Sequence, residues 1–370
     1  MIKVFKPNLS FFDKISVFKA LLKNEISGTS SEVKKFEEQI CTTFERKYAV
    51  TLSNGSSALE VAFRLLKLKK GDEVILPSFT IISCLSAVIR SGGTPVFCDV
   101  DPNTWNMTFE DIKKSFTKKT KAVLIVHSYG LTADAVNIRE FCIQNDIKII
   151  EDTAEAHGQK IGNKKCGTFG DISTLSFYAN KHVTTGEGGA ILTDNIDFYN
   201  SAKKIINLDF DNRKRFVHDN LYWNYRLGGL QSALGTSQLK KLNKVINSKI
   251  IQGNKYIDLF KKYNVDVQLP LVSTTNSKNH FWVFGIVLNN GLNRDLLMER
   301  LFDKGIETRP FFHPLHLQPA LKEKEASSLH LPVSEKIGKY GLYIPLGKHV
   351  TYKKQKKIVL EIKNLISEIG

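Results

Sequence analysis

The sequence contains few cysteines and no long apolar run. Its five cysteines include no CxxC pair, so neither a metal site nor a disulfide framework is indicated. No apolar stretch approaches the roughly 18 residues of a membrane-spanning helix, and the opening MIKVFK lacks the apolar core of a signal peptide. We therefore expect a cytoplasmic protein that has reduced thiols, no bound metal and no membrane partner.

Basic residues outnumber acidic ones: the chain has 53 lysines and arginines and 37 aspartates and glutamates, which gives a formal net charge of +16. A basic excess is typical of nucleic-acid-binding proteins, but here the lysines are spread along the chain and form no basic arm. A lysine-rich solvated surface explains the excess, which would also suit ligands that carry phosphate groups. We predict no nucleic-acid partner.

Strand-like and helix-like stretches alternate between about residues 48 and 194. The strands, such as 122–126, are almost continuously apolar, as expected where helices cover both faces of a sheet, and the alternation indicates βαβ units. The length of 370 residues suits two domains. We predict an α/β fold with a mostly parallel sheet in residues 1–245, after an N-terminal helical segment, and a smaller α+β domain in residues 246–370.

One lysine stands between a predicted strand and a glycine-rich turn, in the segment SFYANKHVTTGEGG at 176–189. The apolar residues before it predict a strand that ends near Ala179, and the glycines let the backbone turn sharply. Lys181 therefore lies on a loop at a strand end. A desolvated lysine there can attack a carbonyl and form a Schiff base, although a solvated surface lysine is the alternative in so basic a chain.

An aspartate follows the strand predicted at 147–150. Asp152 falls at the carboxyl end of that strand, the edge at which open α/β sheets bind ligands. An aspartate and a lysine at neighbouring strand ends are what pyridoxal 5′-phosphate (PLP) requires, because the lysine anchors the cofactor and the carboxylate keeps its ring nitrogen protonated. The pair predicts a PLP site with Lys181 as the catalytic residue.

A loop of small residues, SNGSS at 53–57, links a predicted strand to a helix. The free backbone N–H groups and the dipole of such a helix favour an anion, which makes the loop a candidate phosphate site. A serine-rich helix cap without a ligand is the alternative.

Three segments occur in the same order as in a known family: EDTAEAHG at 151–158, SFYANKHVTTGEGG, and NYRLGGLQSALGTSQL at 224–239. They resemble the DegT/DnrJ/EryC1/StrS family of PLP-dependent nucleotide-sugar aminotransferases, and within it the GDP-perosamine synthases, over residues 28–345. The resemblance implies a fold-type-I homodimer with shared active sites. It also implies transfer of an amino group from L-glutamate, through pyridoxamine 5′-phosphate, to a nucleotide-linked 4-keto-6-deoxyhexose for surface polysaccharide.

The resemblance also assigns residues to the cofactor. The phosphate would be held by four residues, the last of them from the neighbouring subunit: Ser56, Ser57, Ser176 and Asn224. Ile81 stands where the family usually stacks an aromatic residue on the ring, so that either Ile81 or Phe79 would cover it. Glu155 stands where glutamine is usual and would border the ring.

A basic and aromatic stretch, GIETRPFFHPLH at 305–316, follows in the second half. Arg309, Phe311 and His313 are candidates for contact with the nucleotide sugar, because arginine pairs phosphate and aromatic rings stack on bases. Plain core packing is the alternative for Phe311 and its neighbour Phe312.

Other activities remain open. A 3-dehydratase of the same family has histidine in place of the lysine, but counting back from Gly186 puts Lys181, and not His182, at the lysine position. A desulfurase would need a reactive cysteine, for which Cys166 is the nearest candidate. A dTDP- or UDP-linked sugar substrate and a non-catalytic sugar-nucleotide-binding regulator are further alternatives.

Overall fold

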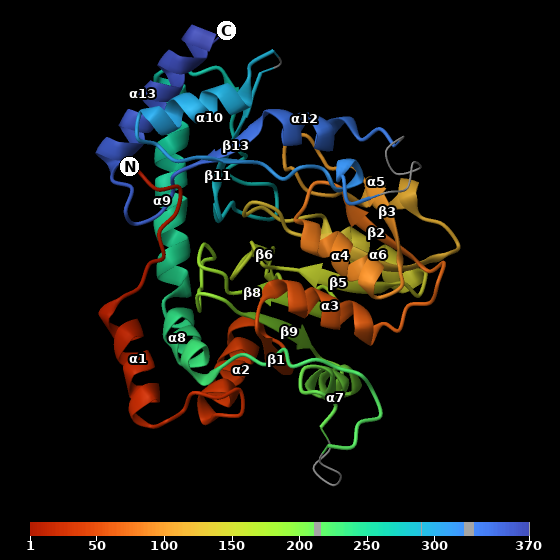
Figure 1. Cartoon of the computed structure of the whole chain (residues 1–370). Coiled ribbons are helices and arrows are strands. Elements are labelled where there is room, and N and C mark those ends of the chain that lie inside the picture. The colour runs from red at the N-terminus through yellow and green to blue at the C-terminus, as the bar shows by residue number, and fades with distance from the viewer. Residues whose placement is uncertain (211–215, 290, 322–328, 370) are drawn as a thin grey trace.

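The computed structural model describes residues 1–210, 216–289, 291–321 and 329–369 (Figure 1). The helices are α1 (Phe11–Leu22), α2 (Ser31–Phe44), α3 (Gly55–Leu65), α4 (Ile82–Arg90), α5 (Phe109–Ser115), α6 (Ala135–Gln144), α7 (Ile196–Ile205), α8 (Gly229–Leu239), α9 (Leu242–Lys262), α10 (Arg294–Asp303), α12 (Pro332–Tyr340) and α13 (Tyr352–Ile369), with a short 3₁₀ helix at Leu315–Leu317.

A seven-stranded sheet forms the larger part of the molecule, in the order β1-β9-β8-β5-β4-β2-β3. Its strands are β1 (Tyr48–Leu52), β2 (Glu73–Pro77), β3 (Thr94–Cys98), β4 (Thr120–Val126), β5 (Lys148–Asp152), β8 (Ile172–Ser176) and β9 (Gly189–Thr193). All of them except β9 run in one direction, because the pairs from β8 to β3 are parallel and β9 is antiparallel to both β1 and β8. The carboxyl ends of six strands therefore share one edge.

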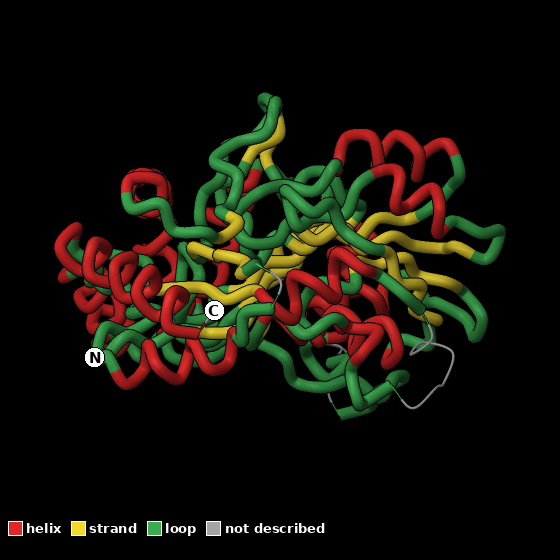
Figure 2. Tube along the Cα trace, turned by 90° about the horizontal axis from the view of Figure 1, so that it is seen from above, coloured by secondary structure: helices red, strands yellow, loops and turns green. Residues whose placement is uncertain are grey.

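Helices cover both faces of this sheet, as Figure 2 shows from above. Alternate residues of one strand face opposite ways, so Leu124 packs in the core beneath α3 and α4, whereas Val123 and Ile125 pack with α5 and α6. This burial on two sides is the reason for the continuous apolar strands. The predicted α/β class with a mostly parallel sheet is confirmed.

A second, antiparallel sheet lies in the C-terminal part, in the order β10-β11-β13-β12. Its strands are β10 (Val267–Gln268), β11 (Phe284–Leu288), β12 (Arg309–Pro310) and β13 (Gly341–Ile344), and a hairpin of β6 (Lys160–Ile161) and β7 (Lys164–Lys165) stands apart. Helix α9 joins the two parts, since Leu242 and Ile246 pack with the large sheet and Tyr256 and Phe260 with the small one (Figure 1). A domain boundary near residue 245 stays a prediction.

The apolar segment 281–287 has the pattern of a strand, but the strand in the structure begins later. Phe281 has a left-handed backbone (φ 48°), which ends any extended run, and β11 starts at Phe284. Trp282 therefore lies on the loop before the strand. Among the described residues, no helix is both long and apolar enough to cross a membrane.

Candidate active site

The main cavity opens at the shared carboxyl edge of the large sheet and has a volume of about 520 Å³. The segments that follow β1, β2, β4, β5 and β8 each supply part of its lining, and the loop before β11 closes it from the other side. Residues far apart in the sequence meet here because parallel strands end at one edge. The lining includes Gly55, Ser56, Thr80, Ile81, His127, Asp152, Glu155, Ser176, Tyr178, Lys181, Trp282, Phe312 and Tyr343.

Lys181 lies on the loop after β8, where its backbone N–H donates to the Tyr178 carbonyl. Its side chain is only 10% exposed, and its Nζ lies 3.5 Å from Glu155 Oε1 and 3.8 Å from the centre of the Trp282 ring. Burial lowers the pKa of Lys181, and the nearby carboxylates of Glu155 and Asp152 oppose this shift. A lysine with a lowered pKa is more often unprotonated, and so more nucleophilic.

Asp152 ends β5 and faces the same cavity while it is almost fully buried. It accepts hydrogen bonds from the Ala154 N–H at 2.9 Å and from Cys84 Sγ at 3.7 Å. Burial raises its pKa, against the effect of the Lys181 charge. Lys181 forms its ion pair with Glu155, and within the described residues Asp152 has no ion pair, so a buried carboxylate faces the cavity without a bonded cation.

Helix α3 points its N-terminus at the cavity. Asn54 caps the helix by accepting from the Ser57 N–H at 2.8 Å, and the first helical residue, Gly55, packs against the end of β8. A Cβ on Gly55 would lie 2.8 Å from Ser176 Cβ, so glycine is needed for this close approach. Ser56 lines the cavity with its hydroxyl 2.7 Å from that of Ser83.

Of the four predicted phosphate ligands, the structure brings two to the cavity. Ser56 and Ser176 line the cavity. The Ser57 hydroxyl instead donates to the Asn54 carbonyl at 2.8 Å as part of the cap, and Asn224 is exposed, with its side-chain oxygen accepting from Arg226. Asn224 does not line the cavity of its own chain, and its expected contact with a neighbouring subunit stays a prediction.

Glu155 lies beside Lys181 at the cavity wall and is 7% exposed. Its Oε2 accepts from the Tyr129 N–H at 2.9 Å. Burial raises the pKa of Glu155 to about 7, against the effect of the Lys181 charge. The site therefore has an acid that can hold a proton near neutral pH next to the lysine.

The two candidates for covering the ring are placed differently. Ile81 is 41% exposed and lines the cavity. Phe79 is fully buried in an aromatic cluster with Tyr129 and Phe311. Only Ile81 is in a position to contact a ligand in the cavity.

The predicted substrate residues lie outside the cavity lining. Arg309 is exposed and pairs with Glu307 at 2.9 Å, Phe311 belongs to the buried aromatic cluster, and the exposed His313 faces the Leu317 carbonyl at 3.2 Å. Phe311 is therefore placed as the alternative of plain core packing predicts, and not as a substrate contact. The neighbouring Phe312 does line the cavity.

Sequence reasoning missed the aromatic wall formed by Tyr178, Trp282, Phe312 and Tyr343. Trp282 could have been singled out, because it is one of only three tryptophans and stands in an apolar segment. The apolar pattern, however, indicated a strand at this position and not a loop. Nothing around Tyr343 in the sequence marks it as a cavity residue.

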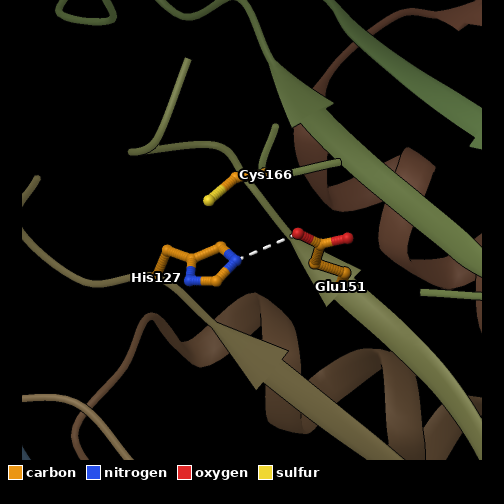
Figure 3. Close-up of side chains that lie close together, drawn as sticks. All are labelled: His127, Glu151 and Cys166. Carbon is orange, nitrogen blue, oxygen red and sulfur yellow. Dashed lines mark hydrogen bonds and ion pairs between the residues drawn. The ribbon is translucent and has the colours of Figure 1, made fainter. Parts of the chain in front are cut away.

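His127, which lines the cavity, belongs to a buried cluster with Glu151 and Cys166 (Figure 3). His127 Nδ1 accepts from the Ala133 N–H and its Nε2 faces Glu151 Oε1 at 3.0 Å. Glu151 also accepts from the Ser173 hydroxyl and from three backbone N–H groups, those of residues 167, 169 and 170. The hydrogen bonds within the cluster already occupy the His127 nitrogens and the Glu151 oxygens that a metal would need. We therefore interpret the cluster as structural.

Cys166 also shows no sign of activation. It is fully buried, and burial raises its pKa well above the usual value. A cysteine nucleophile needs a lowered pKa and access to substrate. The placement of Cys166 therefore gives no support to a desulfurase.

Known proteins resemble this chain over its whole length. It is 35% identical over 345 residues to a GDP-perosamine synthase of Escherichia coli O157:H7, which covers 93% of each chain. Among solved structures, an aminotransferase from Streptoalloteichus hindustanus superimposes with a TM-score of 0.92 at 25% identity, covering 100% of this chain and 99% of the other. The PLP form of a putative sugar aminotransferase from Streptococcus pneumoniae has a TM-score of 0.90 at 20% identity, covering 100% and 99%.

The family model itself matches residues 12–363, nearly all of the chain. This match extends well beyond the three segments from which the resemblance was first drawn. The chain belongs to the DegT/DnrJ/EryC1/StrS aminotransferase family.

Proposed function

We propose that this protein is a PLP-dependent sugar aminotransferase that moves an amino group from L-glutamate to a nucleotide-linked 4-keto-6-deoxyhexose. The observation that carries the proposal is that Lys181 and Asp152 come from neighbouring strand ends and face one cavity. A lysine and a carboxylate in this arrangement match the two contacts that PLP requires, an amine that anchors the cofactor and a carboxylate at its ring nitrogen.

The cavity residues fit this cofactor. Asp152 is a buried carboxylate that has no bonded cation among the residues the structure describes, and a protonated ring nitrogen would satisfy it. The α3 N-terminus, with Ser56 and Ser176 beside it, suits a phosphate group, and Ile81 supplies an apolar surface for one ring face. When bound, PLP supplies an electron sink that stabilises negative charge at the carbon next to the substrate nitrogen.

Lys181 performs the proton transfers in this proposal. Its Nζ would anchor the cofactor in the resting enzyme and, once the amino donor has taken its place, would accept the proton from the donor α-carbon and pass it to the cofactor. In the second half of the cycle the same nitrogen would take a proton back from the cofactor and deliver it to the sugar carbon that receives the amino group. Glu155, 3.5 Å away, is placed to stabilise the charged form of Lys181 between these steps.

For the sugar substrate we propose GDP-4-keto-6-deoxymannose, converted to GDP-perosamine in the cytoplasm for surface polysaccharide. The support is the similarity to the E. coli GDP-perosamine synthase. The aromatic wall suits stacking on a sugar or base, and the basic chain suits a nucleotide diphosphate. Arg309 and His313 would contact the substrate from outside the single-chain cavity.

We further propose a homodimer in which Asn224 of one subunit completes the phosphate site of the other. The α3 end of the cavity supports this, because Ser56 and Ile81 are exposed in the single chain. A second subunit would cover them and exclude water from the cofactor.

The test is a spectroscopic titration of the purified protein with PLP, first alone, then with L-glutamate, then with GDP-, dTDP- and UDP-linked 4-keto sugars. A visible band that forms with PLP, bleaches with glutamate and returns only with the GDP sugar is the expected result. If the band returned with a dTDP- or UDP-linked sugar instead, that sugar would be the substrate and the proposed GDP sugar would be wrong. Failure to form the band would overturn Lys181 as the anchor and favour a dehydratase-like enzyme or a regulator.

A further inference from the structure

The buried Asp152 carboxylate accepts a hydrogen bond from one side chain, and that side chain is a thiol. Cys84, on the first turn of α4, donates from Sγ to Asp152 Oδ2 at 3.7 Å, across 68 residues of sequence. The Ala154 N–H donates to the other oxygen, Oδ1, at 2.9 Å. Because the two donors bind different oxygens, together they fix the rotation of the carboxyl group, and no other residue that the structure describes donates a hydrogen bond to it.

The Cys84 thiol has a partner of its own on the loop before α4. Its Sγ lies 3.6 Å from Thr80 Oγ1. An ionised carboxylate can only accept hydrogen bonds, so the thiol hydrogen points to Asp152 and the Thr80 hydroxyl donates to the sulfur. The side chains of Thr80 and Cys84 are both buried. The hydrogen bonds therefore run in one direction, from Thr80 through Cys84 to Asp152, and bonds in such a chain strengthen one another.

Burial alone does not explain this contact. Three other cysteines are buried, and none of them has a side-chain hydrogen bond within the described residues: Cys98, Cys142 and Cys166. A buried free cysteine normally behaves as a small apolar side chain, as these three do. Cys84 differs from them because its thiol contacts an ionisable group that faces the main cavity.

The environment of Asp152 disfavours its charged form, because burial raises the pKa of this carboxyl. The Ala154 N–H, the Lys181 charge and the Cys84 hydrogen bond oppose that shift. In the proposed function Lys181 bonds to the cofactor and changes its charge during the cycle, whereas the Cys84 thiol donates throughout. The other titratable groups that face Asp152 lie after β4, β5 and β8: His127, Glu155 and Lys181.

We propose that Cys84 is a positioning residue for Asp152: its thiol holds the carboxylate in the orientation and the ionised form that the ring nitrogen of PLP requires. Cys84 is not among the residues that line the main cavity, so it acts through Asp152 and not on the cofactor itself. The inference rests on the proposed function, because it requires PLP to bind at Asp152.

Two alanine substitutions separate the contact with Asp152 from the loss of a buried sulfur. Cys84→Ala removes the thiol that binds the carboxylate, and Cys98→Ala removes a buried thiol that has no such contact. Each is made with and without Asp152→Asn in cofactor-free, full-length protein, and urea unfolding is measured across a pH series. The difference in free energy of unfolding with and without Asp152→Asn isolates the pH dependence that Asp152 contributes. If Cys84→Ala fails to fold, Cys84→Val, which fills the space without a donor, replaces it.

The first readout is the pH at which Asp152 ionises in the folded protein. Because folding raises the pKa of Asp152 above its usual 3.8, its contribution to stability falls as the pH rises from that value and levels off at the pKa of the folded state. We expect the levelling-off about one pH unit higher in Cys84→Ala, as for the loss of a hydrogen bond to the charged form, and at the wild-type pH in Cys98→Ala. Levelling-off at the same pH in Cys84→Ala and the wild type would overturn the proposal.

The second readout is the affinity for PLP, measured from the visible band. Cys84→Ala should raise the dissociation constant roughly fivefold, as for the loss of one hydrogen bond, and Cys98→Ala should leave it unchanged. An unchanged dissociation constant in Cys84→Ala, or an equal rise in Cys98→Ala, would overturn the role of Cys84 and leave the proposed function intact. A wild-type protein that forms no band with PLP would overturn the proposed function, and this inference with it.

Discussion

The two sides of the main cavity differ in chemistry and in origin. The side formed by the large sheet carries Lys181, Asp152, Glu155 and the α3 N-terminus, all at or just after strand ends. The opposite side is the aromatic wall, to which the C-terminal part contributes Trp282, Phe312 and Tyr343, and the loop after β8 contributes Tyr178. Charge that can act on a bound group lies on the first side, and surface that can select a substrate lies on the second.

This difference separates chemistry from specificity in a testable way. Substitutions on the sheet side should lower the rate at any substrate concentration, because in the proposed mechanism these residues act on the reacting atoms. Substitutions on the aromatic wall should raise KM with a smaller effect on kcat. A sheet-side substitution that changes mainly KM, or a substitution on the aromatic wall that changes mainly kcat, would show that the role of that side is assigned wrongly.

The largest effect is expected for Lys181→Ala. Loss of the group that transfers the proton in the proposed mechanism should lower kcat by about 10²–10⁴-fold and abolish the visible PLP band. The thermal unfolding temperature of the cofactor-free protein should stay close to that of the wild type, because Lys181 lies on a loop. Turnover at the wild-type rate would remove Lys181 from the mechanism.

Asp152→Asn should rank second, with kcat lower by about 10²-fold, as for the loss of one fixed electrostatic contact. The same change should raise the thermal stability of the cofactor-free protein at neutral pH. Because burial raises the pKa of Asp152, the folded state favours the neutral form, and ionisation above the usual pKa costs stability. Lower stability together with unchanged kcat would make Asp152 a structural residue.

The sequence predicted the sheet side of this comparison far better than the wall. A strand that ends at Asp152 or shortly before Lys181 is a local pattern, and parallel topology alone brings such strand ends together. The wall depends on how the C-terminal part packs against the large sheet, a long-range contact that no local pattern encodes. Phe311 and Phe312 show the limit, because two identical adjacent side chains divide between the buried core and the cavity.

Glu155→Gln should change the free energy of unfolding of the cofactor-free protein, and the size of this change depends on pH. Burial raises the pKa of Glu155 from its usual 4.5 to about 7, so the folded protein binds this proton more tightly than the unfolded chain does. Its contribution to stability is therefore present below pH 4.5 and is lost as the pH rises to about 7, by at most about 3 kcal/mol. Urea unfolding of the cofactor-free variant should show a higher free energy of unfolding than wild type at pH 7 and above, and no difference at low pH.

A Glu155→Gln variant with the wild-type dependence of stability on pH would assign that dependence to other groups. The buried histidines are the obvious source, because burial lowers the pKa of His157 to about 3 and of His280 to about 4. Their effect has the opposite sign: stability falls as the pH drops below their usual value of 6.5. The pH window in which stability changes therefore identifies the group.

The smallest effect is expected on the wall, where Phe312→Ala should raise KM for the nucleotide sugar by roughly tenfold, since one aromatic contact contributes about 1 kcal/mol or somewhat more. The rate constant kcat and the unfolding temperature should change little, because Phe312 is only partly buried. Arg309→Ala is the matched comparison, since Arg309 is exposed and paired with Glu307. If Arg309→Ala raises KM more than Phe312→Ala does, the substrate extends beyond the single-chain cavity and the basic stretch at 305–316 is its binding surface. If only Phe312→Ala raises KM, specificity resides in the aromatic wall.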